Sequence, residues 1–435
     1  MTEEKINVQS EDTQSLSKNI KKLLFDNMVT IMFLILGILG VIFSELPIFF
    51  IVNELLTRLA RNSFLVLALI IPVLAGMGLN FAITVGAMAG QAAILMVVHW
   101  KIPGIYGFIL AWILTIPIAI ILGILTGKLL NKTKGQEMIA SLITGYFANG
   151  IYQFIFLFGI GTFIPMTNKV LILGDGVGIR NTVDLARNNG IKYSIDNLAK
   201  FPLFPVLIVA GILLALFSIY QLTKNEEKLI VKVYRPKYFA FLGLSALLII
   251  MGLLFTFNIG IPINLQPLRM LKIPLATLGL VALSGVFHIL IVKTKLGQKF
   301  RTVGQDKHIA SVSGINVNKI RVIAITISTV LAGWGQIIFL QNMGIMNTYG
   351  SHVQIALFSI AAILIGGASV TKATVGQAIL GVILFHTLFI VSPRAAQNIF
   401  GDAQIGEFFR NFISYGVIGV ALGLYAWKKR FNKTA

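Results

Sequence analysis

The sequence contains no cysteine among its 435 residues. Disulfide bonds and thiolate metal sites are therefore excluded, and cysteine usage carries no information about the redox compartment. Charge is also scarce, because Asp, Glu, Lys and Arg make up 12% of the residues whereas 56% are hydrophobic. A soluble domain carries about 25% charged residues. The composition therefore excludes an ordinary soluble protein.

The hydrophobic residues are gathered in stretches of about 18 to 25 residues, the length that a helix needs to cross a bilayer. Backbone groups in lipid must be satisfied within their own segment, so each stretch is helical. We predict an all-α integral membrane protein, a polytopic bundle of about 10 to 12 transmembrane helices. The predicted spans are 27–44, 63–81, 82–99, 104–127, 138–164, 202–222, 239–257, 274–292, 320–341, 353–367, 374–392 and 408–427.

The formal net charge of +20 is explained by the orientation of such a bundle. With the N-terminus inside, most Lys and Arg residues fall in cytoplasmic segments, as the positive-inside rule requires. Nucleic acid is therefore not the expected partner. The prediction is a cytoplasmic N-terminal tail (1–26) without the features of a signal peptide, a transmembrane domain (27–427) and a cytoplasmic C-terminal tail (428–435).

Acidic side chains are nearly absent from the predicted spans. Ion-coupled carriers usually keep an embedded carboxylate for the coupling ion, but here the candidates lie at or beyond span ends: Glu45, Glu54, Glu137, Asp402 and Glu407. Secondary transport is disfavoured, although sodium sites made of carbonyls and hydroxyls stay open. A channel is disfavoured because no filter sequence is visible.

No nucleotide or metal site is predicted. The segments 123–128 and 366–372 each end in lysine but lack the spacing of a phosphate-binding loop. The five histidines show no metal-ligand spacing. His288 and His386 lie inside spans, where an ionisable residue is a functional candidate. The alternative is that each imidazole bonds a neighbouring helix.

Two segments outside the spans are notable. The external segment 165–200 is rich in Gly, Asn and Asp, and is either a docking surface or a plain connector. The internal segment 293–319 contains a stretch, 306–313, that is long enough for two helical turns. Asp306 is its expected N-cap and Gly314 its expected stop. A short capped helix on the cytoplasmic face predicts a protein partner.

Two predicted helices carry features of a translocation path. In 82–99, Gly86 and Gly90 form a small-xxx-small pair beside Gln91, which favours close helix packing. The preceding span is interrupted near Asn80, and broken helices at membrane depth are tolerated mainly beside cavities or other protein. In 138–164, small and polar residues follow one helical face, which predicts that this face points inward: Ser141, Thr144, Gly145, Ala148, Asn149, Tyr152 and Gln153.

The segment 301–315 reads RTVGQDKHIASVSGI. It resembles the cytoplasmic loop of permeases from the ribose, nucleoside and branched-chain amino-acid ABC importers, whose pattern is Arg-Ala-x-Gly-x-Asn-x-x-Ala-Ala-x-x-x-Gly-Ile. The matching positions are Arg301, Gly304, Ala310, Gly314 and Ile315. The departures are Thr302 for Ala, Asp306 for Asn and Ile309 for the first Ala. Asp preserves the capping ability of Asn.

Weaker similarities extend over most of 65–425. The stretches 328–336, ending in Gln336, and 359–369 are similar to small-residue and glycine-rich helices of this family. The stretches 86–91 and 136–154 are similar to the nucleoside branch. The family core commonly has fewer spans, so 27–44 would be an addition.

The resemblance implies the fold of a type II importer permease in a bacterial plasma membrane. A second permease chain would complete the path, and the helix at 306–313 would be the coupling helix, seated on a separate ABC ATPase subunit that binds ATP and Mg. This chain would bind no cofactor and would not be an enzyme. An external substrate-binding lipoprotein would deliver a nucleoside or simple sugar; a branched-chain amino acid and an ion-coupled carrier are the alternatives.

The resemblance and the residue patterns together give two sets of candidate site residues. The coupling set is Arg301, Gly304, Asp306, Ala310, Gly314 and Ile315. The translocation-path set is Asn80, Gly86, Gly90, Gln91, Ser141, Asn149, Gln153 and Gln336.

Overall fold

The computed structural model describes residues 27–133, 135–224 and 231–434, and is built mainly of α-helices. The predicted N-terminal tail, 1–26, lies outside the described residues. The chain divides into two compact units. The first comprises Met1–Leu46, Arg58–Ser194 and Leu280–Ala435, and the second comprises Pro47–Thr57 and Ile195–Gly279.

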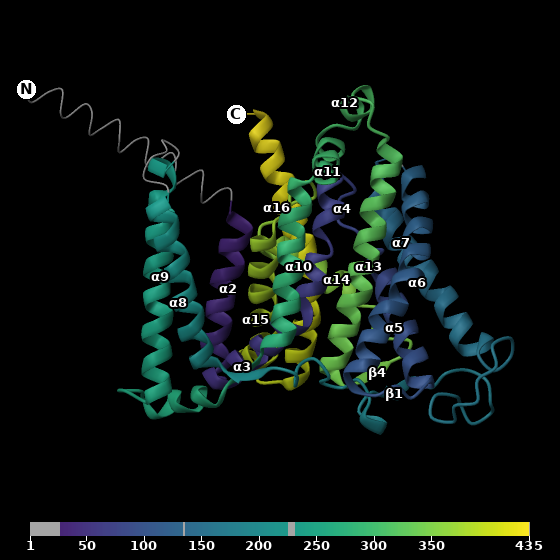
Figure 1. Cartoon of the computed structure of the whole chain (residues 1–435), viewed down its shortest axis with the longest axis horizontal. Helices are drawn as coiled ribbons and strands as arrows, with labels where there is room; N and C mark the ends of the chain where they lie inside the picture. The colour runs from purple at the N-terminus through teal and green to yellow at the C-terminus, as the bar shows by residue number, and fades with distance from the viewer. Residues whose placement is uncertain (1–26, 134, 225–230, 435) are drawn as a thin grey trace, which may run out of the picture. The chain divides into compact units, whose positions relative to one another are not determined.

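The helices of the first unit make its bundle (Figure 1). They are α2 (Met28–Ser44), α4 (Ile70–Leu74), α5 (Ile83–His99), α6 (Gly104–Lys132), α7 (Glu137–Phe154), a π-helical turn (Ile155–Gly159), a 3₁₀ turn (Arg187–Asn189), α11 (Lys295–Gln305), α12 (Lys307–Val312), α13 (Val317–Met343), α14 (Ile355–Ile365), α15 (Val375–Phe400) and α16 (Ala403–Thr434). The unit boundary falls within α3 (Ile48–Leu67) and α10 (Leu275–Lys293).

The fold confirms a polytopic all-α membrane protein. Among the described residues, eight helices are long and apolar enough to cross a membrane, and three shorter apolar helices are α2, α5 and α14. Each of the twelve predicted spans overlaps a helix, the twelfth being α16.

One predicted span start was wrong. The span predicted at 63–81 begins at Ile48 instead, because charged residues at 54, 58 and 61 lower the hydropathy of a segment that is nevertheless helical. Glu54 therefore lies inside a helix and not beyond a span end. The predicted C-terminal tail, 428–435, is helical as far as residue 434, and its cytoplasmic location stays a prediction.

Helix α13 packs against both α5 and α6 within the first unit (Figure 1). Glycines permit this arrangement, because a side chain at Gly86 or Gly90 would overlap the backbone of α13. A side chain at Gly123 or Gly127 of α6 would also overlap the backbone of α13. Small residues let helix backbones approach closely in membranes, where packing drives helix association. The predicted close packing of 82–99 is confirmed.

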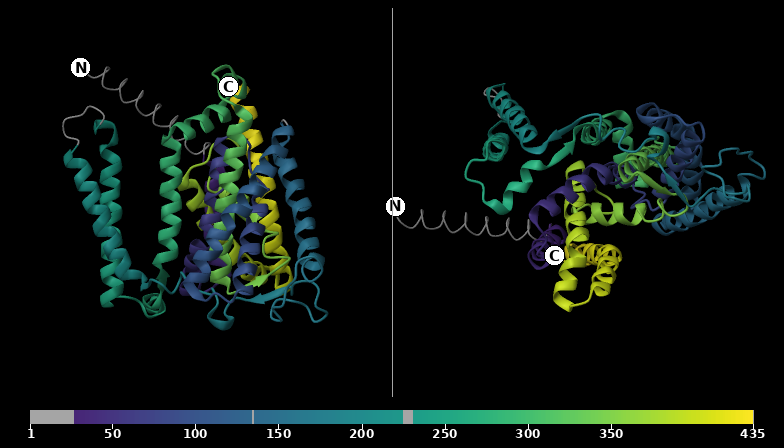
Figure 2. Two further views of the ribbon diagram at one scale, coloured as in Figure 1. Left: turned by 45° about the vertical axis from the view of Figure 1, so that its right-hand side comes forward. Right: turned by 90° about the horizontal axis from the view of Figure 1, so that it is seen from below.

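The second unit contains an antiparallel pair of long helices, α8 (Leu203–Lys224) and α9 (Val231–Phe257) (Figure 2). Phe204 and Phe255 stack with ring centroids 4.2 Å apart. A 3₁₀ helix, Ile263–Met270, contributes Leu268 to the same core. The strands β2 (Lys200–Pro202) and β3 (Lys272–Pro274) pair antiparallel.

The predicted external loop is 165–200, and its residues up to 194 belong to the first unit. Its strand β1 (Thr182–Asp184) pairs antiparallel with β4 (Ile345–Asn347), the strand that follows α13. The Tyr349 hydroxyl donates to the Ile179 carbonyl at 2.7 Å. Within the first unit, this sheet lies at the end away from α12 (Figure 1).

Candidate functional site

The loop between α10 and α13 forms the two short helices α11 and α12. Asp306 caps α12, since its carboxylate accepts from the backbone N–H of His308 at 2.7 Å and of Ile309 at 3.0 Å. These hydrogen bonds, the one from Ile309 first, lower the pKa of Asp306. Asp306 is therefore the predicted N-cap of this helix.

The C-terminal end of α12 is equally well defined. Gly314 has φ +77°, in the left-handed region that favours glycine. The N–H of Gly314 donates to the Ser311 carbonyl and the N–H of Ile315 to the Ala310 carbonyl, both at 3.0 Å. This pair of bonds is a Schellman motif. The predicted glycine stop is confirmed.

The other matched residues of the loop separate into an inner and an outer set. Ala310 is fully buried, and a side chain at Gly304 would overlap the Leu74 carbonyl oxygen. Outside, Ile309 and Val312 are 58% and 77% exposed and lie three residues apart, so they share a face. Arg301 is also exposed. The loop is thus fixed by its small residues and presents an apolar outer face.

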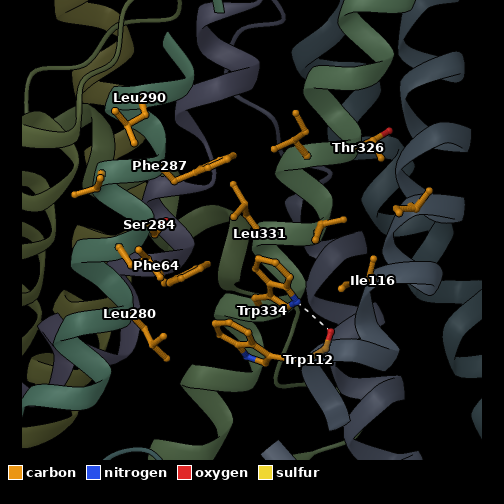
Figure 3. Close-up of a pocket in the computed structure, with 15 residues that line it drawn as sticks. Phe64, Trp112, Ile116, Leu280, Ser284, Phe287, Leu290, Thr326, Leu331 and Trp334 are labelled. Atoms are coloured by element: carbon orange, nitrogen blue, oxygen red, sulfur yellow. Dashed lines mark hydrogen bonds between the residues drawn. The ribbon is translucent and has the colours of Figure 1, made fainter. Parts of the chain in front are cut away.

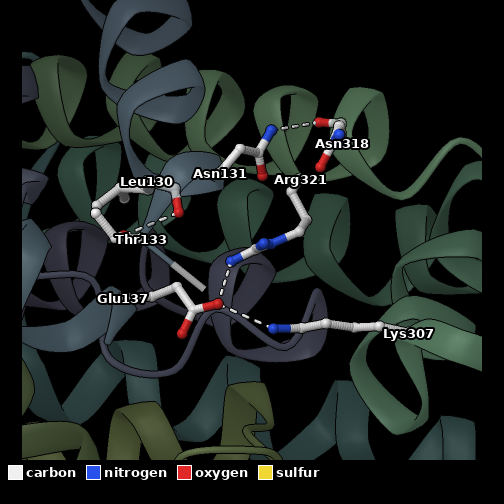
Figure 4. A network of polar contacts seen from close by, with 7 residues as sticks. All are labelled: Leu130, Asn131, Thr133, Glu137, Lys307, Asn318 and Arg321. Atoms are coloured by element: carbon white, nitrogen blue, oxygen red, sulfur yellow. Dashed lines mark hydrogen bonds and ion pairs between the residues drawn. The ribbon is translucent and has the colours of Figure 1, made fainter. Parts of the chain in front are cut away.

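An ion network joins this loop to two long helices (Figure 4). Glu137, at the first position of α7, accepts from Lys307 Nζ at 2.9 Å and from Arg321 Nη2 at 2.5 Å. Lys307 is the first residue of α12, whereas Arg321 lies on α13 and is 2% exposed. The sequence carries no signal for this network, because its members are far apart in the chain and share no motif.

The break after α4 has the predicted irregular backbone. Gly76 and Gly78 have φ values of +68° and +67°. Asn80 is buried and its side-chain oxygen accepts from the N–H of Ala82 at 3.1 Å. The N–H of Phe81, freed by the break, donates to Ser141 Oγ on α7 at 3.0 Å. Two of the path candidates, at positions 80 and 141, therefore satisfy backbone at the break.

Helix α7 buries the face that its pattern predicts. Ser141, Thr144, Gly145 and Tyr152 are buried, whereas Phe147 on the other side is exposed. The inward orientation of this stripe is confirmed. Contact between this face of α7 and a transported solute stays a prediction.

Two path candidates contact His352, which is not among the predicted site residues, and a third path candidate contacts one of these two. The Nδ1 atom of His352 lies 2.7 Å from Gln91 Oε1, and its Nε2 atom lies 2.7 Å from Asn149 Oδ1. Gln153 Nε2 donates to Asn149 Oδ1 at 3.4 Å. His352 lies in the turn before α14, so no helical spacing linked it to α5 or α7. Another path candidate, Gln336, is buried on α13 and donates to the Ser351 carbonyl at 3.3 Å.

A cavity of about 120 Å³ adjoins this network. It is bounded by side chains from the break, α5, α7, the turn before α14, α14 and α16. Its polar and aromatic lining consists of Phe81, Thr84, Tyr146, Asn149, His352, Gln354 and Tyr415. No Asp, Glu, Lys or Arg is among the lining residues.

A larger pocket of about 630 Å³ has a different chemistry (Figure 3). It lies between α6, α13 and the part of α10 that belongs to the first unit. Trp112 and Trp334 stack in its wall at 4.8 Å, and Trp334 Nε1 donates to the Trp112 carbonyl at 3.1 Å. Ser284 and Thr326 are its hydroxyl-bearing residues, and the remainder is apolar. Such a lining suits acyl chains, and it does not suit a polar solute.

Comparison with known proteins places the chain in a family. Residues 190–418 match the family described as "Branched-chain amino acid transport system / permease component". The chain belongs to this family of ABC permeases. It is also similar to the "Probable ABC transporter permease protein YphD" of Escherichia coli (strain K12), with 28% identity over 157 residues, which cover 34% of this chain and 47% of that protein. The chain therefore spans about half the length of this relative, and no solved structure matches it.

The two histidines predicted inside spans are both buried in the permease. His288 Nδ1 lies 2.7 Å from the Ser284 carbonyl, one turn earlier in α10. His386 contacts the ring of Phe385 on α15. Neither lines the 120 Å³ cavity. Within the described ranges, no three His, Asp or Glu side chains are grouped as metal ligands.

Proposed function

We propose that this permease is the membrane-spanning subunit of an ABC importer that moves a nucleoside or simple sugar. The observation that carries the proposal is the outer face of α12, where Ile309 and Val312 are exposed on a helix whose two ends are fixed. Exposed apolar side chains on a polar loop favour a protein contact. A groove in a separate ATPase subunit, which would bind ATP and Mg, is the proposed contact.

The ion network supports the same function. A displacement of α12 acts on Lys307 and hence, through Glu137, on the first turn of α7. Asn149, three turns further along α7, lines the 120 Å³ cavity. The ion network therefore connects α12, the proposed ATPase contact, to α7, the helix that carries the buried polar face. Arg321 connects the same carboxylate to α13.

The proposed orientation places α12 and both termini in the cytoplasm of a bacterial cell. The distribution of Lys and Arg supports it. The external end would then receive a binding lipoprotein, and a second permease chain would complete the path. The substrate preference rests on the stretches similar to nucleoside permeases and on the uncharged lining of the cavity. A branched-chain amino acid is the second candidate, because the family description names it.

The test is co-purification of the detergent-solubilised permease with a co-expressed ABC ATPase subunit from the same organism. Ile309→Asp and Val312→Asp should each reduce the recovered ATPase at least tenfold, because each places a charge in the proposed apolar contact. Phe163→Asp is the matched control, since Phe163 is 82% exposed but lies outside the loop. Recovery unchanged by both loop variants would contradict the coupling role of α12.

A further inference from the structure

The wall of the 120 Å³ cavity beside His352 includes the side-chain amide of Asn149, which has an unused hydrogen-bond donor. Asn149 Oδ1 is engaged by His352 Nε2 and Gln153 Nε2. The Asn149 Nδ2 atom makes no hydrogen bond to the described residues. An amide offers two donors and an acceptor. Half of this amide is therefore available to a molecule in the cavity.

The direction of the Asn149 amide is set by the residues behind it. Gln91 and His352 are fully buried. A neutral imidazole donates from one ring nitrogen only, so donation from His352 Nε2 to Asn149 Oδ1 makes Nδ1 the acceptor that faces the Gln91 amide. The His352 Nε2–H group therefore keeps the Asn149 oxygen turned towards the imidazole ring and the NH₂ end of the amide towards the cavity. His352 is thus a positioning residue.

The rest of the lining supplies aromatic and hydroxyl groups. Tyr146 is 66% exposed on α7, Tyr415 is exposed on α16, and Thr84 lies on α5. Aromatic faces cover planar or ring-shaped groups, and amides pair with hydroxyls and with the edges of bases. A zwitterionic amino acid would need charged partners for its carboxylate and ammonium groups, because unpaired ions are costly to desolvate. The lining offers none.

We propose that this cavity is a solute-contact site for an uncharged, hydroxylated ring compound, with Asn149 touching the solute and His352 holding Asn149. The assignment rests on the proposed import function and gives it a place in the fold. It also adds His352, Tyr146 and Thr84 to the predicted path residues. Gly86 and Gly90 act behind the site, as close-packing positions against α13.

The absence of cysteine provides the experiment. Leu142→Cys and Thr84→Cys introduce single thiols into the full chain at two lining positions and leave Asn149 in place, and a hydrophilic methanethiosulfonate reagent labels them in membranes if the cavity holds water. Ile143→Cys is the matched control, because Ile143 is exposed on the outward side of α7. Millimolar uridine, ribose and leucine serve as protecting probes.

We expect uridine or ribose to slow labelling at positions 84 and 142 at least fivefold, and leucine to leave it unchanged. Absence of labelling, labelling that no probe slows, or protection by leucine alone would overturn the site. In uptake by cells that also express an ABC ATPase subunit and a binding protein from the same organism, His352→Phe should raise KM about tenfold and His352→Gln should restore most of it. Equal KM values would refute the positioning role. Failure of ATP-dependent uptake of every probe by the unaltered complex, with labelling still protected, would refute the import function alone.

Discussion

The ion network at Glu137 provides the sharpest stability prediction. The change is Glu137→Gln, which keeps the size of the side chain and removes its charge. Arg321, 2% exposed, would then keep a buried charge whose carboxylate partner is lost. Removing one member of a buried ion pair costs about 3–5 kcal/mol.

Lys307 provides the internal comparison. Its side chain is 44% exposed, whereas that of Arg321 is 3% exposed. Exposed ion pairs are worth about 0.2–1 kcal/mol. We therefore expect Lys307→Gln to be several times less destabilising than Glu137→Gln, although both break a bond to the same carboxylate.

A double variant tests the cost of the buried arginine in a second way. Replacing a buried ion pair by apolar residues of similar volume is often neutral, so Glu137→Leu with Arg321→Met should recover most of the stability lost in Glu137→Gln. The measurement is denaturant unfolding in detergent, followed by tryptophan fluorescence. Equal losses in Glu137→Gln and Lys307→Gln, or a double variant as unstable as Glu137→Gln, would refute the assignment of the cost to the buried arginine.

Three further predictions concern close packing and the helix cap. Gly304→Ala should cost about 1–3 kcal/mol by overpacking against the Leu74 carbonyl oxygen, seen as a lower midpoint in the same unfolding assay; an unchanged midpoint would contradict this contact. Gly90→Ala should have a similar cost against Gly333 on α13, whereas Gly419→Ala, where no neighbour is near, should have little effect. Asp306→Ala should speed tryptic cleavage of the loop and Asp306→Asn should not, because Asn also caps. The lowered pKa of Asp306 means that its cap is fully present above the ordinary carboxyl pKa and is lost only as pH falls through the lowered value, so cleavage should be the same at pH 6 and pH 8.

The sequence predicted the fold class because span length and hydropathy follow directly from the thickness of a bilayer. It also predicted α12, since Asp306 and Gly314 act through backbone bonds within a few residues. The buried face of α7 followed from helical periodicity. The start of α3 was missed because tertiary packing holds a helix whose charged residues depress its hydropathy.

The residues that only the tertiary structure revealed are those whose partners are distant in the chain. Glu137 contacts residues 170 and 184 positions away, and His352 contacts residues 261 and 203 positions away. Sequence spacing carries no record of such pairs, since they depend on how α5, α7, α13 and the turn before α14 pack. The sequence by itself therefore determined a membrane helix bundle with a short capped helix in one of its loops. The packing of its helices decided which polar residues share a cavity, and so where a solute is proposed to bind.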